Sequence, residues 1–172
     1  KKLIAEPYFD VGYSNESGLR ELIQRAGSTM DQIELDVERT LVDHFLQEVM
    51  KSNPKATYGE LMIRSALEQG AVSTLLLSES LNHRRVSFYC KDCKEAWERT
   101  KLKNVENGKC PSCDSNQVYE DEEKSMDLID NLSLLAGHTS AQVRLISLDT
   151  EEGATLSSAF GGIAALLRYP IS

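Results

Sequence analysis

The sequence has few cysteines, few aromatic residues and no long apolar run. No stretch of the 172 residues approaches the roughly 20 apolar residues that a membrane-spanning helix needs. The opening segment, "KKLIAEPYFD", lacks the apolar core and small-residue cleavage site of a secretory signal. We therefore expect a cytoplasmic protein that does not associate with membranes.

The sequence also lacks an excess of positive charge. Its formal net charge is −8 and its pI is about 4.9. General nucleic-acid binders and proteins of anionic membranes usually present a basic face that displaces counterions from phosphates. The charge balance argues against both classes, although a local basic patch remains compatible with it. The 41% of hydrophobic residues is enough for a real core.

The four cysteines all lie in one stretch, "CKDCKEAWERTKLKNVENGKCPSC", as two CxxC pairs. A cytosolic protein keeps its thiols reduced, so paired CxxC motifs indicate a metal site rather than disulfides. A thioredoxin-like redox unit would carry one CxxC at the start of a helix. Four cysteines fill the coordination sphere of a tetrahedral ion, which predicts one structural zinc. The predicted ligands are Cys90, Cys93, Cys110 and Cys113.

Periodicity and turn signals predict alternating helices and strands. A capping box of Thr57 and Glu60 and a terminal Gly70 delimit the helix in "LMIRSALEQG". This order predicts an α/β fold: a three-layer sandwich with a mixed, largely parallel sheet and an inserted zinc-ribbon mini-domain. The expected helices are residues 17–30, 31–50, 61–70, 125–141 and 150–162, and the expected strands are residues 8–13, 71–81, 84–90, 116–123, 142–149 and 163–170.

No catalytic motif stands out. The three histidines, His44, His83 and His138, have no nucleophile or carboxylate at a motif spacing beside them. The paired glycines in "FGGIAA" follow a predicted helix, where they favour a C-terminal cap and a tight turn over a phosphate loop. We expect a chain that is not an enzyme.

Several segments, in order and with matching spacing, resemble the class 1 peptide chain release factors of archaea and eukaryotes. They are "YFDVGYSNESGLRELIQRA", "LVDHFLQEV", "YGELMIRSALEQGAVSTLLLSESL" and "DTEEGATLSSAFGGIAALLRY". The paired CxxC motifs resemble the archaeal branch of that family. The Gly-Gly-Gln loop with which the family releases the peptide does not occur in the sequence.

The resemblance implies a C-terminal fragment of a release factor. Residues 1–30 would be the tail of the middle domain, and residues 31–172 the C-terminal partner-binding domain with a zinc-ribbon insertion at about 86–120. The full-length factor would recognise stop codons and trigger peptidyl-tRNA hydrolysis on the ribosome. The C-terminal domain of the family docks an elongation-factor-like translational GTPase and an ABC-type ribosome-recycling ATPase.

Carried over by position, the partner-binding surface would involve the long helix and the last strand. The residues concerned are Phe45, Leu46, Val49, Leu167, Arg168 and Tyr169. Two other interpretations remain open. One is a domain of the ribosome-rescue factor Pelota, which shares this C-terminal domain. The other is an RNA-contacting zinc ribbon, in which the basic residues would meet phosphates; these are Lys91, Lys94, Arg99, Lys101 and Lys103.

Overall fold

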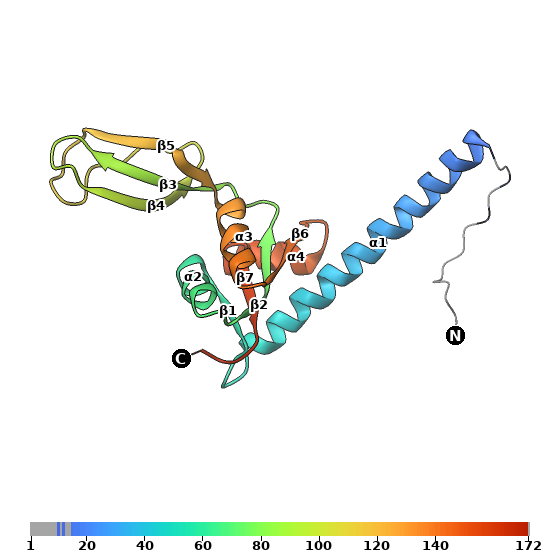
Figure 1. Cartoon of the computed structure of the whole chain (residues 1–172). Coiled ribbons are helices and arrows are strands. Elements are labelled where there is room, and N and C mark those ends of the chain that lie inside the picture. The colour runs from blue at the N-terminus through green and yellow to red at the C-terminus, as the bar shows by residue number, and fades with distance from the viewer. Residues whose placement is uncertain (1–9, 11, 13–14, 172) are drawn as a thin grey trace.

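The computed structural model describes residues 10, 12 and 15–171. Apart from Asp10 and Gly12, the strand predicted at residues 8–13 lies outside the described part of the chain. The described elements, in chain order, are α1 (Glu16–Val49), β1 (Ala56–Tyr58), α2 (Glu60–Glu68), β2 (Val72–Ser78), β3 (His83–Cys90), β4 (Ala96–Leu102), β5 (Val118–Asp127), α3 (Leu128–His138), β6 (Gln142–Ile146), α4 (Glu151–Phe160) and β7 (Ile163–Leu167). They form an α/β body and a separate ribbon of three strands, which extends from one end of the body (Figure 1).

The sheet of the body has the strand order β1-β7-β2-β6 and is mixed, as predicted. The prediction of a largely parallel sheet was wrong, because only β2 and β6 run parallel, whereas β7 is antiparallel to both β1 and β2. A tight turn reverses the chain before β7. Gly161 and Gly162 have φ values of +68° and +74°, which glycine adopts without a steric cost. The predicted cap and turn at "FGG" is therefore confirmed.

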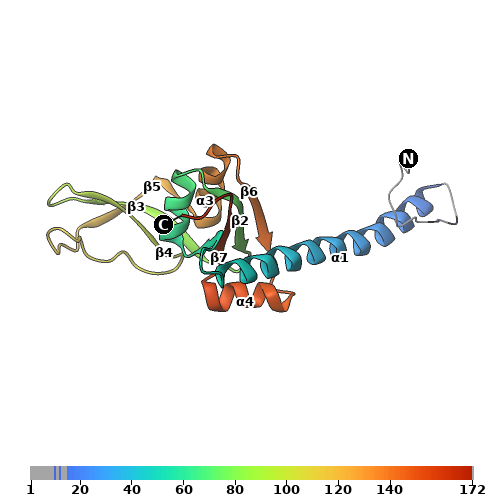
Figure 2. The ribbon, with the colours of Figure 1, turned by 90° about the horizontal axis from the view of Figure 1, so that it is seen from below.

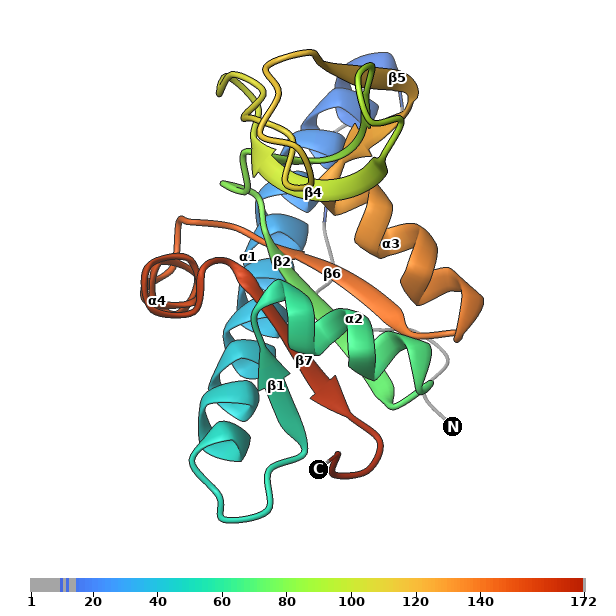
Figure 3. The same cartoon turned by 90° about the vertical axis from the view of Figure 1, so that its left-hand side faces the viewer.

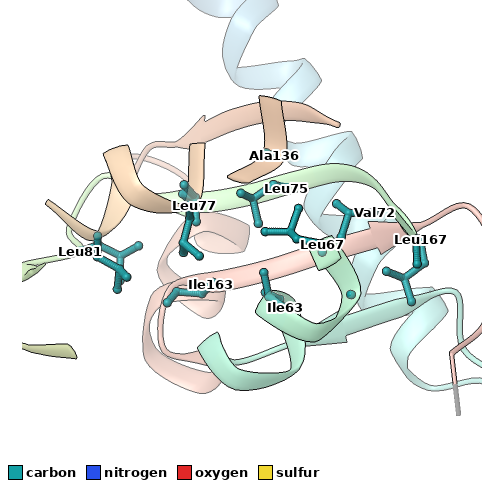
Figure 4. Close-up of a cluster of buried hydrophobic side chains, with 14 residues drawn as sticks. Ile63, Leu67, Val72, Leu75, Leu77, Leu81, Ala136, Ile163 and Leu167 are labelled. Atoms are coloured by element: carbon teal, nitrogen blue, oxygen red, sulfur yellow. The ribbon is translucent and has the colours of Figure 1, made fainter. Parts of the chain in front are cut away.

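Two apolar clusters cover the two faces of this sheet, because successive side chains of a strand point to opposite faces. Leu75 and Leu77 of β2 face α2 and α3, and Leu76 faces α1 and α4. Figure 3 shows α2 and α3 in front of the sheet and α1 behind it. Figure 4 shows the first cluster, with Ile63 and Leu67 of α2 packed against the strands. The body therefore has its own core on each face.

Helix α1 is a single helix of 34 residues, whereas the sequence predicted two helices that meet at residue 30. Asn15 caps it, and its side-chain oxygen accepts from the backbone N–H of Ser17 at 3.1 Å. The sequence offers no proline to interrupt the helix, and Gly27 in its interior is tolerated. The first half of α1 projects beyond the sheet (Figures 1 and 2). The predicted domain boundary at residue 30 therefore falls inside a continuous helix.

The start of α2 also differs from the prediction. The N-cap is Gly59, with φ +80°, and no side chain caps the helix. Thr57 lies in β1, where it pairs with Ala165, so it cannot form the expected capping box with Glu60. The predicted end of α2 is confirmed: Gly70 has φ +65°, and the N–H of Ala71 donates to the carbonyl of Ala66.

The ribbon is an antiparallel sheet with the strand order β4-β3-β5. It occupies residues 83–127, more than the predicted 86–120, because β3 and β5 continue into the body. Glu60 of α2 holds it there: the Thr100 hydroxyl donates to Oε1 of Glu60 at 2.6 Å, and Arg85 lies 3.7 Å from the same oxygen. Within the described residues, no helix has both the length and the apolar character to cross a membrane.

Candidate metal centre and docking surface

The two CxxC motifs form two turns with matching backbone geometry. In the first, Lys94 donates its N–H to the carbonyl of Cys90, and in the second Asp114 donates to the carbonyl of Cys110, at 2.9 and 3.0 Å. Lys94 and Asp114 both adopt positive φ values, 62° and 58°. Each turn thereby directs its two sulfurs to the same side. Antiparallel pairing of β3 with β4 and β5 brings the two turns together.

The four sulfur atoms lie within 4.8 Å of one another. Sγ of Cys90 is 3.6 Å from Sγ of Cys113, and Sγ of Cys93 is 3.5 Å from Sγ of Cys110. A tetrahedral ion with metal–sulfur bonds of about 2.3 Å sets its ligands about 3.8 Å apart. The arrangement can therefore hold one four-coordinate metal ion.

Crowding of the sulfurs separates the pKa values of the thiols. The backbone N–H of Cys93 donates to the Cys90 sulfur and lowers the pKa of that thiol to about 7. The backbone N–H of Ser115 lowers the pKa of Cys113, but the nearby Cys93 thiol and burial outweigh it and raise this pKa to about 12. Four thiolates at this spacing repel one another. A divalent cation at their centre offsets that repulsion.

The five basic residues of the RNA-contacting interpretation do not form one free cationic surface. The Lys101 ammonium lies 3.2 Å from Glu120 and donates to the carbonyl of Val105 and the side chain of Asn107. Lys103 pairs with Asp127, and Lys91 lies over the ring of Tyr119. Among the described residues, only Lys94 and Arg99 of the five have no such contact. This gives little support to the RNA-contacting interpretation.

Two of the predicted partner-binding residues are in the core instead. Phe45 is fully buried and packs edge-on against Phe160 at 5.0 Å, and Leu167 is 6% exposed. Leu46 and Val49 are half-buried and pack against the same cluster as Phe45. Helical spacing shows that one stripe of α1 is apolar, but it does not show whether that stripe faces the core or a partner. Here the stripe packs into the core.

Arg168 and Tyr169 are exposed, but their polar atoms bind the chain itself. The Arg168 guanidinium donates to the carbonyls of Gly70, Thr139 and Ser140 at 2.8, 3.0 and 3.1 Å. The Tyr169 hydroxyl donates to the carbonyl of Gln69 at 2.8 Å. Arg168 therefore joins the end of α2 to the end of α3, which is a structural role.

Four large apolar residues are exposed at the end of α1, in β1 and at the start of α2. We call them the apolar corner; they are Met50, Tyr58, Leu61 and Met62, which are 86, 49, 81 and 50% exposed. A groove of about 450 Å³, lined by Val49, Tyr58 and Met62 among others, runs beside it. The sequence carries a signal for it: in "LMI" at residues 61–63, three consecutive apolar residues of a helix cannot all face one core.

The chain belongs to the family described as eRF1 domain 3, whose model matches residues 35–171. It is 42% identical over 161 residues to peptide chain release factor subunit 1 of Archaeoglobus fulgidus, an alignment that covers 94% of this chain and 39% of that protein. The chain thus spans about two fifths of the length of this curated relative.

Solved structures share the fold. The C-terminal domain of the peptide chain release factor from Methanosarcina mazei is 37% identical, with a TM-score of 0.77, and the match covers 92% of this chain and 98% of that one. Archaeal Pelota, in a structure described as ribosome-bound Pelota and ABCE1, is 21% identical with a TM-score of 0.58 over 95% of this chain and 35% of that one. The second match shows a common fold only.

Proposed function

We propose that this chain is the partner-docking, non-catalytic part of an archaeal-type translation termination factor, acting in the cytoplasm on the ribosome. The observation that carries the proposal is the family match over residues 35–171, together with the high similarity to a release-factor C-terminal domain. The partners are an elongation-factor-like translational GTPase and an ABC-type recycling ATPase. The shared fold of a Pelota described as ribosome-bound with ABCE1 supports the second partner.

The proposed domain organisation follows from the same match. The docking domain corresponds to residues 31–172, and residues 1–30 correspond to the end of the preceding domain. The start of the family match at residue 35, inside α1, supports a boundary within this helix. The helix then acts as a rigid connection between the two domains.

The proposed metal is zinc, in a structural role. Four thiolates suit zinc or iron, and four protein ligands in a closed tetrahedron leave no position for a water or substrate. The residues that hold it are Cys90, Cys93, Cys110 and Cys113. When bound, the ion offsets part of the negative charge of the thiolates and links the two turns of the ribbon.

The apolar corner is the proposed contact for the GTPase, in place of the buried Phe45 and Leu167. Large exposed apolar side chains grouped beside a groove are typical of protein interfaces. Leu46, Val49, Arg168 and Tyr169 stay within the proposal as further contact residues, and Val49 lines the groove beside the corner. The corner belongs to the body, so docking does not require the ribbon.

Calorimetric titration of the purified chain with the purified GTPase tests this function. We expect binding, and we expect Leu61→Ser with Met62→Ser to weaken it by about tenfold or more. Leu134→Ser is the matched control, because Leu134 is a 55% exposed leucine on α3, a helix that contributes no residue to the corner. No binding by the unaltered chain would contradict the function, and equal losses in the double variant and the control would contradict the surface.

A further inference from the structure

A second groove, of about 550 Å³, lies between α1 and β6. Its wall on one side is formed by α1, including Leu35, Val37 and Leu41. On the other side it is lined by Val143, Arg144 and Leu145, three consecutive residues of β6. Because successive side chains of a strand point to opposite faces, a groove that touches all three runs along the edge of the strand.

That edge of β6 has no strand beside it in the described part of the chain. β6 is the last strand in the order β1-β7-β2-β6, and it pairs only with β2. Figure 3 shows β6 as the outermost strand of the sheet, with α1 behind it. Exposed strand edges present unpaired N–H and C=O groups that can pair with an extended segment of another chain. Leu145, which is 47% exposed, adds an apolar contact there.

Carboxylates surround the groove. Glu34, Glu38, Glu79 and Asp149 line it, against a single cation, Arg144. Glu38 is 8% exposed, and its Oε2 accepts from the N–H of Ser147 at 2.9 Å. Burial raises the pKa of Glu38, and the charges of Glu79, Glu34 and Asp149 raise it further. A positively charged group placed in the groove would offset this repulsion.

We propose that the groove binds an extended, basic peptide segment of a partner protein, which pairs with the free edge of β6 as an added strand. Lysine or arginine side chains of the segment meet the carboxylates on the α1 side of the sheet, and its apolar side chains, on the opposite face of the added strand, cover Leu145. The groove's acidic lining repels nucleic acid and anionic lipid. The site is separate from the apolar corner and does not rest on the proposed function, since the two surfaces share no residue.

The probe is a short fluorescein-labelled peptide in which lysine alternates with valine, titrated with the purified chain. We expect saturable binding, with slower amide exchange at residues 142–146. The variant Glu34→Gln, Glu79→Gln, Asp149→Asn should weaken binding by about tenfold. These three carboxylates have no hydrogen bond or ion pair among the described residues, so the fold should persist. The control variant, Glu68→Gln, Glu106→Gln, Glu122→Gln, makes the same charge change elsewhere.

Two further peptides separate strand pairing from charge alone. A peptide of glutamate alternating with valine should not bind. The lysine peptide with N-methyl groups at alternate residues keeps its charge but cannot donate along one edge, so it should bind much more weakly. Equal binding of the methylated and unmethylated peptides would overturn the strand-pairing proposal, as would equal losses in both charge variants. Dimerisation of the chain that the first variant abolishes would show that a second copy occupies the groove instead.

Discussion

The body and the ribbon of this chain are stabilised in different ways. All five residues of β7, in the centre of the body, are buried, and two apolar clusters cover the sheet. In the ribbon, β4 and β5 have no buried residue, and β3 contributes Val86, Phe88 and Cys90. A module of this size buries too little apolar surface to fold unaided. The ribbon therefore depends on cross-links that the body does not need.

The links between the strands of the ribbon are ion pairs at one place and the cluster of four thiols at another. Glu120 of β5 lies 2.9 Å from Arg84 of β3 and 3.2 Å from Lys101 of β4, so one carboxylate joins all three strands. The cysteine cluster closes the far end. Partly exposed ion pairs contribute little, whereas a structural zinc contributes about 10 kcal/mol or more to folding. Because the two parts are stabilised differently, we expect that the ribbon can be unfolded while the body stays folded.

The largest expected effect is that of Cys93→Ser. Losing one of four ligands should release the metal and unfold the ribbon, since binding and folding are the same event in such a module. Trp97, the single tryptophan, stacks on Phe88 in the ribbon at 5.6 Å. We expect its emission to shift to the red while far-ultraviolet circular dichroism still reports the helices of the body. Ser112→Ala, within the second turn, should change neither signal.

Phe45→Ala tests how much the apolar core contributes to the stability of the body. Removing a fully buried aromatic side chain from the cluster behind the sheet should lower the free energy of unfolding by about 3–5 kcal/mol. Chemical denaturation followed by circular dichroism measures the loss. His44→Ala, at the exposed neighbouring position, should stay within about 0.5 kcal/mol. A stable Phe45→Ala variant that fails only in GTPase binding would restore the original surface assignment.

Arg168→Ala should have a smaller effect, again on the body. Its guanidinium donates to three carbonyls at the ends of α2 and α3, and their loss should cost about 1–2 kcal/mol. If Arg168 instead belonged to the partner-binding surface, as the resemblance implied, the variant would bind the GTPase more weakly at an unchanged melting temperature. Thermal melts of Arg168→Ala and Arg168→Lys distinguish the two. Lysine cannot reproduce the planar fork, so it should rescue little; an unchanged melt in both variants would refute the structural role.

The smallest predicted effect on stability is an increase, whereas the preceding variants lower stability. Burial raises the pKa of Glu38 above 4.5, so the folded chain holds this proton more tightly than the unfolded chain does. Ionisation of Glu38 therefore costs stability once the pH rises above the unfolded value. Glu38→Gln keeps an oxygen for the N–H of Ser147 but cannot ionise. We expect a slightly higher melting temperature at neutral pH and a difference that shrinks as the pH falls towards 4.5. A lower melting temperature at neutral pH would show that the charge is favourable.

The sequence predicted the ribbon better than the surface of the body. The grouping of Cys90, Cys93, Cys110 and Cys113 into one cluster followed from spacing alone, because two CxxC motifs have few other uses, and the sulfurs do converge. The strand β7 followed from its apolar run, but its direction did not, because periodicity carries no information on parallel or antiparallel pairing. The length of α1 was missed because a single glycine and a polar stretch look like a helix end in sequence.

The residues of the proposed docking surface were the hardest to predict. Phe45 and Met50 are both large apolar residues near the end of α1, yet one is fully buried and the other 86% exposed. Which of them faces the sheet depends on how the helix crosses it, and this is a property of tertiary packing. For the same reason, the free edge of β6 beside α1 became visible only in three dimensions.

Hydrogen–deuterium exchange of the intact chain, before and after treatment with a zinc chelator, tests most directly whether the body and the ribbon are stabilised in different ways. A self-supporting body and a metal-dependent ribbon predict that chelation removes protection over residues 83–127, while β2 and β7 keep theirs. Unchanged protection in the ribbon would contradict a structural metal. Simultaneous loss of protection in β2 and β7 would contradict the independence of the body.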